Sequence, residues 1–214
     1  MLQKKIYFVA AVGTDIGKTF LVEKLCRNLV GANAIKPIVS GFSDYDLNSD
    51  TAKIITALDL KITPENFNEI SPWRFTEVAS PHFAAKSYGA EIDFLAVKNF
   101  CDKKIATAQQ FGSYLFVESA GGIMTPINDQ KTFLDLATEL KIPLLLVTAN
   151  YLGAISHTLS AVEAVKARGL EIEKIIINND LPAISKTPYD IAATIENFAK
   201  IPTVDLSEFF KKLA

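Results

Sequence analysis

The segment "AAVGTDIGKTF", residues 10–20, contains the residue types that cradle a phosphate group. Its Gly-Lys-Thr triplet opens a segment with helical periodicity, so backbone N–H groups and the positive end of a helix would face an anion. Lys18 would reach the outer phosphates of a nucleotide, and the Thr19 hydroxyl would bind magnesium. The usual loop has a glycine five residues before Gly17, where this chain has Val12, with Gly13 one residue later. Nucleotide binding is favoured over an ordinary strand-to-helix turn with an exposed lysine.

Two acidic residues could meet a metal ion near such a loop. Glu118 in "LFVESAGG" ends an apolar run, and the small residues Ser119, Ala120 and Gly121 after it would let a ligand approach the backbone. Its position fits a second acidic magnesium ligand and a plain turn residue about equally well. Asp50 in "NSDTAKII", taken by itself, is typical of a helix cap or of an acid in a first helical turn.

A lysine within an apolar strand is the third feature that could do chemistry. In "AIKPIVSG", Lys36 is costly to bury unless it meets an anion, and Ser40 follows in a loop beyond Pro37. The alternative is a structural lysine that extends to solvent from an edge strand. The functional interpretation is modestly favoured.

The elements that must position these residues alternate along the chain. Apolar runs alternate with segments of helical periodicity, which predicts an α/β fold with a mostly parallel sheet between two layers of helices. In such a sheet the ligand site lies beyond the carboxyl ends of the strands. Residues 40–90 are the least regular part, which favours a functional segment. The expected strands span 5–12, 33–39, 113–119, 142–149 and 173–179, and the expected helices span 17–30, 49–58, 92–111, 131–140, 155–168 and 188–199.

Composition narrows the class of function. The 214 residues are 49% hydrophobic with a net charge of -2, which favours one domain over residues 1–214 and small-molecule chemistry, without general attraction to nucleic acid or membranes. No apolar run reaches the ~18 residues of a membrane span, and the N-terminus has no signal peptide pattern, so a cytoplasmic protein is expected. Cys26 and Cys101 are expected to be buried, reduced thiols.

Taken in order, several motifs resemble the dethiobiotin synthetase family of the P-loop NTPase superfamily. They are "FVAAVGTDIGKT", "KPIVSG", "NSD", "SPHFAA", "VESAGGIMTPI", "LLLVTANYLGAISHTL" and "NND", and they cover nearly the whole chain. The family loop is one residue longer before Gly-Lys-Thr, which accounts for the failed spacing. Its first glycine corresponds to Ala11, so the chain departs from its family there, and Gly13 is expected to supply the flexibility.

The resemblance implies an ATP-dependent ring closure that converts 7,8-diaminononanoate and CO2, supplied with bicarbonate, into dethiobiotin in biotin biosynthesis. One amine captures CO2 as a carbamate, the γ-phosphoryl group moves to the carbamate, and the second amine displaces phosphate. The implied magnesium ligands are Thr19, Asp50 and Glu118. Lys36 would stabilise the carbamate and the transferring phosphoryl group, and the remaining implied contacts are Thr14 and Ser40 with the carbamate or amines, and Asp15, Ile16, Gly17, Lys18, Phe20, Ser119, Ala120 and Gly121 with the nucleotide.

Further contacts implied by the resemblance concern the base and a second subunit. Asn179 and Asp180 would bind the nucleotide base, and the segment Pro202, Thr203 and Val204 would line the adenine. The family is homodimeric, and the acid tail of the substrate would meet Gly153 and Ser156 of the neighbouring protomer, at a helix N-terminus suited to a carboxylate. Tyr189 is an additional expected contact.

Three other functions of P-loop proteins are less favoured. A partitioning-type ATPase would have a lysine early in the loop, where this chain has Gly13. A small-metabolite kinase would have a cluster of arginines over the transferring phosphate, and a GTPase would have Asn-Lys-x-Asp in place of "NND". The resemblance implies no covalent enzyme intermediate. Correspondingly, the chain has no nucleophile elbow, and the two histidines, His82 and His157, lack metal-ligand spacing.

Overall fold

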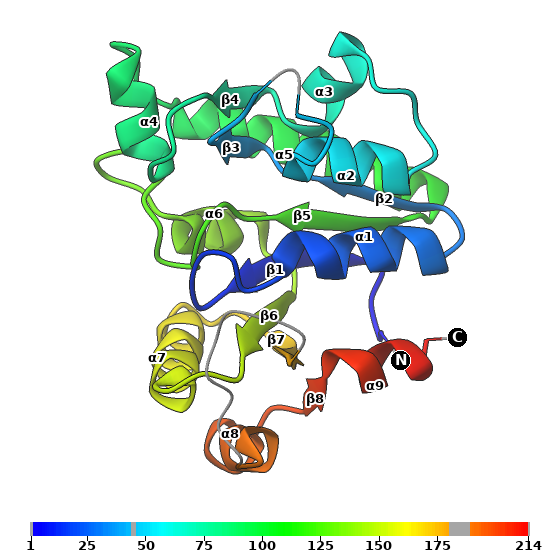
Figure 1. The fold of residues 1–214 in the computed structure, drawn as a ribbon, viewed down its shortest axis with the longest axis vertical. Coiled ribbons are helices and arrows are strands. Elements are labelled where there is room, and N and C mark those ends of the chain that lie inside the picture. Colours follow the sequence, from blue (N-terminus) through cyan, green and yellow to red (C-terminus); the bar gives the residue numbers. More distant parts are fainter. Residues whose placement is uncertain (1, 44–45, 180–188, 214) are drawn as a thin grey trace.

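The computed structural model describes residues 2–43, 46–179 and 189–213. Six parallel strands form one sheet in the order β2-β5-β1-β6-β7-β8, and β3 and β4 form a separate parallel pair (Figure 1). The strands are β1 (Ile6–Ala11), β2 (Ala32–Ile35), β3 (Ile38–Ser40), β4 (Trp73–Phe75), β5 (Tyr114–Glu118), β6 (Leu144–Ala149), β7 (Ile172–Asn178) and β8 (Thr203–Asp205).

Helices lie on both faces of this sheet, as expected from the alternation in the sequence. They are α1 (Lys18–Asn28), α2 (Asp50–Ala57), α3 (Pro64–Ile70), α4 (Pro81–Ser87), α5 (Phe94–Phe111), α6 (Phe133–Leu140), α7 (Ala154–Ala167), α8 (Ile191–Ala199) and α9 (Leu206–Lys211). The α/β fold class is therefore confirmed, whereas the division into one domain stays a prediction.

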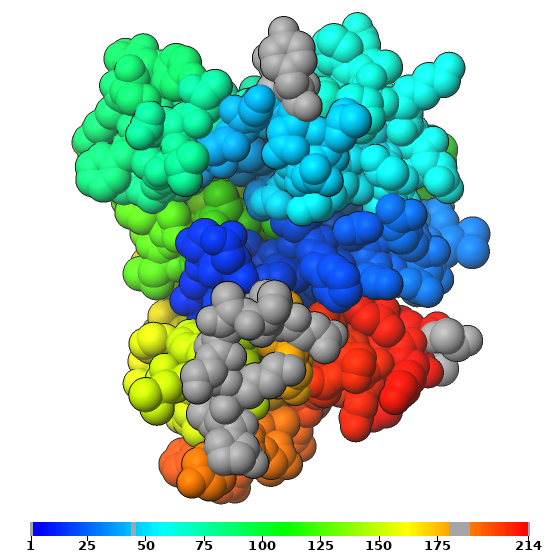
Figure 2. Space-filling view, in the orientation of Figure 1, coloured from blue at the N-terminus to red at the C-terminus, as the bar shows by residue number. Residues whose placement is uncertain are grey.

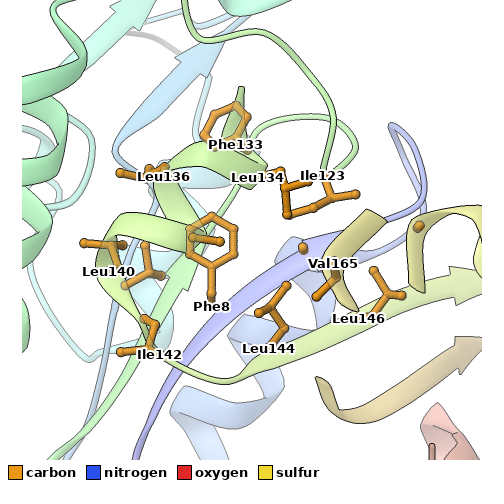
Figure 3. Close-up of a cluster of buried hydrophobic side chains, with 14 of the residues drawn as sticks. Phe8, Ile123, Phe133, Leu134, Leu136, Leu140, Ile142, Leu144, Leu146 and Val165 are labelled. Atoms are coloured by element: carbon orange, nitrogen blue, oxygen red, sulfur yellow. The ribbon is translucent and has the colours of Figure 1, made fainter. Parts of the chain in front are cut away.

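The central strand β1 shows how one sequence covers both faces. Its side chains alternate, so that Phe8 and Ala10 join the core formed with α5, α6, α7 and α8, while Tyr7, Val9 and Ala11 join the core formed with α1, α2, α3 and α9. All five are fully buried. Figure 3 shows Phe8 within the first of these cores, among side chains of α6, β6 and α7. Burial on both faces explains why the run is continuously apolar.

Helix starts are fixed by side chains that satisfy free backbone N–H groups. The Ser49 hydroxyl accepts a hydrogen bond from the N–H of Ala52 at the start of α2, and Asp93 caps α5. Thr132 and Asp135 form a reciprocal capping box at the start of α6. Asp50 is consequently not the cap of α2 but an acid of its first turn, with its side chain available for other contacts.

The predicted strand 33–39 is wrong in one respect, because the structure divides it. β2 ends at Ile35 and β3 begins at Ile38, with Lys36 and Pro37 between them. Pro37 has no N–H to donate to a sheet, and the N–H of Lys36 leaves the sheet to donate to the Ile70 carbonyl at 3.1 Å. Lys36 therefore lies at a break between two strands.

Residues 40–90 are more regular than the sequence indicated, since they contain α2, α3, β4 and α4. The sequence predicts α2 as the helix 49–58, but not α3, β4 and α4, nor β8 and α9 later in the chain. These elements have three to eight residues each, too few for periodicity to identify most of them. Cys26 and Cys101 are free and buried, as predicted. Among the described residues, no helix has the length and apolar character needed to cross a membrane.

Candidate functional site

The order of the strands brings the chemically interesting segments to one place. β5 lies between β2 and β1, so the end of β5 at Glu118 has Lys36, after β2, on one side and the β1–α1 loop on the other. All three strands are parallel, and their carboxyl ends meet at the same edge of the sheet. Figure 2 shows the blue β1–α1 segment in the middle of the molecule. The light-blue and cyan residues lie on one side of it, and the yellow to red C-terminal residues lie on the other.

The β1–α1 loop turns at residues other than the expected Gly13. Gly17 has φ 102° and Asp15 has φ 54°, both in the left-handed region. A Cβ at Gly17 would lie 2.2 Å from Asn178 Nδ2, whereas one at Gly13 would meet only the Ile16 side chain at 3.7 Å. The expectation that Gly13 supplies the flexibility of the loop is therefore wrong. Gly17 is required for its backbone conformation and for a close approach to β7.

Charged side chains from three segments are in direct contact. The Lys36 ammonium donates to Glu118 Oε1 at 2.8 Å and also to Asp50 Oδ2, and it lies 3.4 Å from Thr19 Oγ1. The Thr19 hydroxyl donates to the same Glu118 Oε1 at 2.6 Å. Lys18 donates to the Gly13 carbonyl at 3.2 Å. Lys36 does not extend to solvent, because its side chain is only 7% exposed and pairs with two carboxylates.

Burial and charge shift the pKa values of these groups in different directions. Burial lowers the pKa of Lys18 to about 8, and the nearby Lys36 charge adds to this effect. Burial also opposes the charged form of Lys36, but Glu118 and Asp50 outweigh it and raise the pKa of Lys36. Burial raises the pKa of Asp50, but the Lys36 charge and the hydrogen bonds from Lys36 and Thr19 together outweigh it, so the net pKa is lowered. Lys36 and Asp50 are thus ionised at neutral pH.

The oxygen atoms at this site are suited to a hard divalent cation. Glu118 is 1% exposed, and its Oε2 is buried without a hydrogen-bond partner among the described residues. Thr19, Asp50 and Glu118 offer only oxygen ligands, as Mg²⁺ prefers, and Mg²⁺ commonly takes one or two carboxylates together with substrate phosphates. No group of three or more His, Cys, Asp or Glu residues with metal-binding geometry occurs in the described ranges. The donor set therefore fits a metal shared with a phosphate better than a closed protein site.

Two adjoining cavities open at this edge of the sheet. One, of about 240 Å³, is lined by the β1–α1 loop, Lys36, Asp50, Lys53 and Glu118. The other, of about 390 Å³, is lined by Ser40, by residues 78–81 and by Thr125. The two share five lining residues, namely Thr14, Asp15, Lys36, Asp50 and Gly121. A phosphate in the first cavity and an organic substrate in the second would thus meet at Lys36.

The residues expected at the base lie at the other half of the sheet edge. Asn179 donates to Asp205 Oδ2, and the N–H of Thr203 donates to Glu196 Oε2 at 2.8 Å. Neither these residues nor Pro202 and Val204 line the two cavities. Asp180, the other predicted base-binding residue, lies outside the described residues.

The residues expected at a second subunit lie apart from both cavities. Gly153 and Ser156 are exposed at the start of α7, with Gly153 at φ 97° as the N-cap, and Tyr189 is 76% exposed. Because the resemblance assigns Gly153 and Ser156 to the neighbouring protomer, their position in one chain leaves that prediction untested.

Sequence reasoning missed three contributors to the site. Asn178, 4% exposed at the end of β7, donates to the Ile16 carbonyl at 3.1 Å and so holds the phosphate loop. A Cβ at Gly122 would lie 3.2 Å from the Val12 carbonyl oxygen, so glycine there lets the β5–α6 segment contact the loop backbone. Lys53 lines the smaller cavity. Ligand sites in such sheets lie at the carboxyl ends of the strands. Asn178 could have been found by this rule, since it is the last residue of β7.

Comparisons with known proteins agree with this geometry. A family model described as an AAA domain matches residues 5–206. The chain is similar to proteins named ATP-dependent dethiobiotin synthetase BioD. It is 35% identical to that of Methylobacterium nodulans, covering 91% of this chain and 89% of the relative. The identity to the Caulobacter vibrioides NA1000 protein is 38% over 84% of this chain and 82% of the relative. The identity to the protein of Legionella pneumophila strain Lens is 33% over 95% of this chain and 99% of the relative.

Solved structures share the fold at low sequence identity. A ParA family ATPase from Chlorobium tepidum matches with a TM-score of 0.54 and 14% identity, over 94% of this chain and 83% of that one. The MinD cell division protein of Aquifex aeolicus matches with a TM-score of 0.54 and 12% identity, over 98% and 85%. At these identities the matches support the fold alone.

Proposed function

Because the chain belongs to the ATP-dependent dethiobiotin synthetase family, we propose that it closes the ureido ring of dethiobiotin from 7,8-diaminononanoate, CO2 and ATP. It is then a C–N bond-forming cyclo-ligase of biotin biosynthesis. The observation that carries this proposal beyond family membership is the junction of two cavities at Lys36, whose ammonium contacts both carboxylates of the site.

The smaller cavity is assigned to the triphosphate of ATP. The backbone N–H groups at the start of α1 face this cavity, and Lys18 supplies a buried positive charge beside them. Asp15 through Phe20 would contact the phosphates, with Ser119, Ala120 and Gly121 of the β5–α6 segment close by. Asn178 supports this assignment because its hydrogen bond to the Ile16 carbonyl holds the loop that lines the cavity.

Thr19, Asp50 and Glu118 are assigned to Mg²⁺. A bound Mg²⁺ would supply positive charge to the nonbridging phosphate oxygens as the γ-phosphoryl group transfers. Lys36 donates to Glu118 Oε1 and Asp50 Oδ2, so it pairs with the two carboxylates that would hold such an ion. Release of those contacts would free the Lys36 ammonium for the substrate oxygens at the boundary of the two cavities.

The larger cavity is assigned to the diamine. Ser40 and Thr14 would bind the amines or the carbamate, and Asp15, which lines both cavities, would position an amine beside the nucleotide. One amine nitrogen attacks CO2 and loses a proton, which gives a carbamate. A carbamate oxygen then attacks the γ-phosphorus as ADP leaves, and Lys36 stabilises the negative charge on the transferring oxygens. The second amine attacks the carbonyl carbon, loses a proton and expels phosphate.

The base and the acid tail of the substrate are assigned to the rest of the edge and to a second subunit. Asn179 and Asp180 would bind the base, with Pro202, Thr203 and Val204 along the adenine. In a homodimer, Gly153 and Ser156 would bring free N–H groups at the start of α7 to the tail carboxylate, and Tyr189 would add a contact. α7 has 14 residues, so its aligned peptide dipoles give its N-terminus a partial positive charge that favours a carboxylate.

The proposal is tested by coupling phosphate release to product formation. The protein is incubated with ATP, Mg²⁺, bicarbonate and the diamine, and phosphate and dethiobiotin are measured together. Equal amounts of both, with each lost when diamine or bicarbonate is omitted, are expected. Phosphate release that ignores the diamine would instead indicate a switch ATPase, and a phosphorylated product that persists would indicate a kinase.

A further inference from the structure

Three lysines line the smaller cavity, and only two of them have an evident task. Lys18 and Lys36 are each 6% exposed, and both contact other groups of the site. Lys53 comes from α2 and is exposed. Across the described ranges, its ammonium forms no hydrogen bond or ion pair, while its backbone N–H donates to the Ser49 carbonyl at 3.0 Å. Lys53 is thus a charge beside the phosphate cavity that the fold itself does not use.

The position of Lys53 directs it toward the cavity. It follows Asp50 by three residues on α2, so both side chains lie on the same face of that helix. Its charge is also among the causes of the lowered pKa of Asp50, which agrees with this proximity. α1 and α2 pack side by side (Figure 1). Phe20 of α1 and Lys53 of α2 both line the smaller cavity. Lys53 and Phe20 are exposed parts of the lining, as are Thr14 and Asp15, whereas Glu118 lies at its buried end.

The charges of the lining leave a use for this third cation. Three lysines balance three carboxylates, Asp15, Asp50 and Glu118. The lining therefore has no excess of positive charge to offset the negative charge of a Mg²⁺–nucleotide complex. Loss of one lysine would leave the lining itself with a net negative charge. The three arginines of the chain do not compensate, because Arg27 pairs with Glu23, Arg168 with Asp135, and Arg74 contacts Ser71 and Asn68.

We propose that Lys53 binds a nonbridging phosphate oxygen of the nucleotide and sets nucleotide affinity, in contrast to Lys36, which acts on the reaction. An ammonium at the exposed side of the cavity meets the phosphates equally before and during transfer. Its removal therefore changes KM for ATP and leaves kcat nearly unchanged. The proposal extends the nucleotide site of the proposed function.

The test compares the binding of Mg²⁺–ADP and Mg²⁺–ATP by isothermal titration calorimetry in the wild type, Lys53→Met and Lys61→Met. Lys61 is an exposed lysine shortly after α2 that lines neither cavity, so its variant has the same change of net charge. Lys53→Met is expected to weaken both nucleotides by about 3–10-fold at low salt, less at ~0.5 M salt because an exposed charge is screened. Lys53→Arg should restore most of the affinity, and Lys61→Met should bind as the wild type.

Weakening of ATP alone would also support the proposal and would assign the contact to the terminal phosphate. Affinities within 1.5-fold of the wild type for both nucleotides in Lys53→Met, or an equal loss in Lys61→Met, would overturn it. Because binding is measured without the diamine, a wild type that binds nucleotide but makes no dethiobiotin would defeat the proposed function and leave this test intact. Melting temperatures verify that the variants are folded.

Discussion

The two halves of the sheet edge pair their polar side chains in different ways. At β2, β5 and β1, charged groups pair with one another, as in the contacts of Lys36 with Asp50 and Glu118. At β7 and β8, neutral amides pair with backbone or with a helix cap, as in the contact of Asn178 with the Ile16 carbonyl. A buried charge needs an opposite charge or a ligand, whereas the N–H groups of a neutral amide can donate to any nearby carbonyl or carboxylate oxygen. We therefore expect the first half to carry the reaction and the second half to support binding.

The largest effect should come from the centre of the charged half. Lys36→Met is expected to lower kcat by on the order of 10²–10³-fold, because its charge is needed most where negative charge develops on the transferring group. Affinity for Mg²⁺–ADP should stay within about threefold, since Lys18 and the loop remain in place. Single-turnover kinetics and calorimetry separate these two quantities.

Lys18→Met is the comparison for this prediction, because it should lose nucleotide binding together with turnover. A Lys36→Met enzyme that turns over at the wild-type rate but no longer binds ADP would show that Lys36 is a nucleotide-binding residue instead. Melting curves with and without Mg²⁺ establish that the variant is folded although Asp50 and Glu118 have lost their shared cation.

The next effect concerns the buried carboxylate of the same half. Glu118→Gln keeps the shape but removes the charge, so the Mg²⁺ concentration for half-maximal activity should rise by about tenfold or more, since a charged ligand contributes at least ~1.4 kcal/mol. The titration of activity with Mg²⁺ at saturating ATP measures this shift.

Glu173→Gln is the matched control, because Glu173 is a 7% exposed glutamate near the start of β7 that pairs with Tyr7 and not with the site. Its Mg²⁺ requirement should equal that of the wild type. An unchanged requirement in Glu118→Gln would remove Glu118 from the metal ligands.

The difference between the halves also explains how far sequence alone could go. The layered α/β fold followed from the continuous apolar strands, and the position of Glu118 near the loop followed from the rule that ligand sites lie at the carboxyl ends of strands. The role of Lys36 at the same site was implied by the family resemblance. The apolar pattern runs through the break at Lys36 and Pro37, so it did not predict it, although Pro37 without an N–H was a local sign. The pattern also could not identify the partners distant in sequence that hold Lys36 in place. Those partners are Ile70 for the N–H and Glu118 for the ammonium.

The second half was harder to predict for a physical reason. Asn178 and Asn179 are adjacent and chemically identical, and only the side on which each faces distinguishes their roles. Asn178 contacts the loop, whereas Asn179 contacts Asp205, which caps α9. The short β8, with three residues, gives no period from which this neighbour could be inferred.

Asn178→Ala should therefore have a moderate effect that does not depend on the base. Loss of the hydrogen bond to Ile16 is expected to cost about 1 kcal/mol, or roughly fivefold in the affinity for Mg²⁺–ADP. Inorganic tripolyphosphate should weaken by a similar factor, because the loop and not the base is disturbed. Asn33→Ala, at an exposed asparagine of β2, should change neither. A variant that weakens ADP and leaves tripolyphosphate unchanged would place Asn178 at the base.

The smallest effect is expected at the neighbouring residue. Asn179→Ala should weaken Mg²⁺–ADP by only about two- to threefold, since one neutral hydrogen bond in a partly exposed position contributes roughly 0.5–1 kcal/mol. Tripolyphosphate should bind as it does to the wild type, because Asn179 contacts Asp205 on β8 and does not reach the loop. The ratio of the two affinities measured by calorimetry thus separates the roles of Asn178 and Asn179. Equal weakening of ADP and tripolyphosphate in Asn179→Ala would mean that both asparagines act on the phosphate loop. The half of the sheet edge with amides would then not be the part that binds the base.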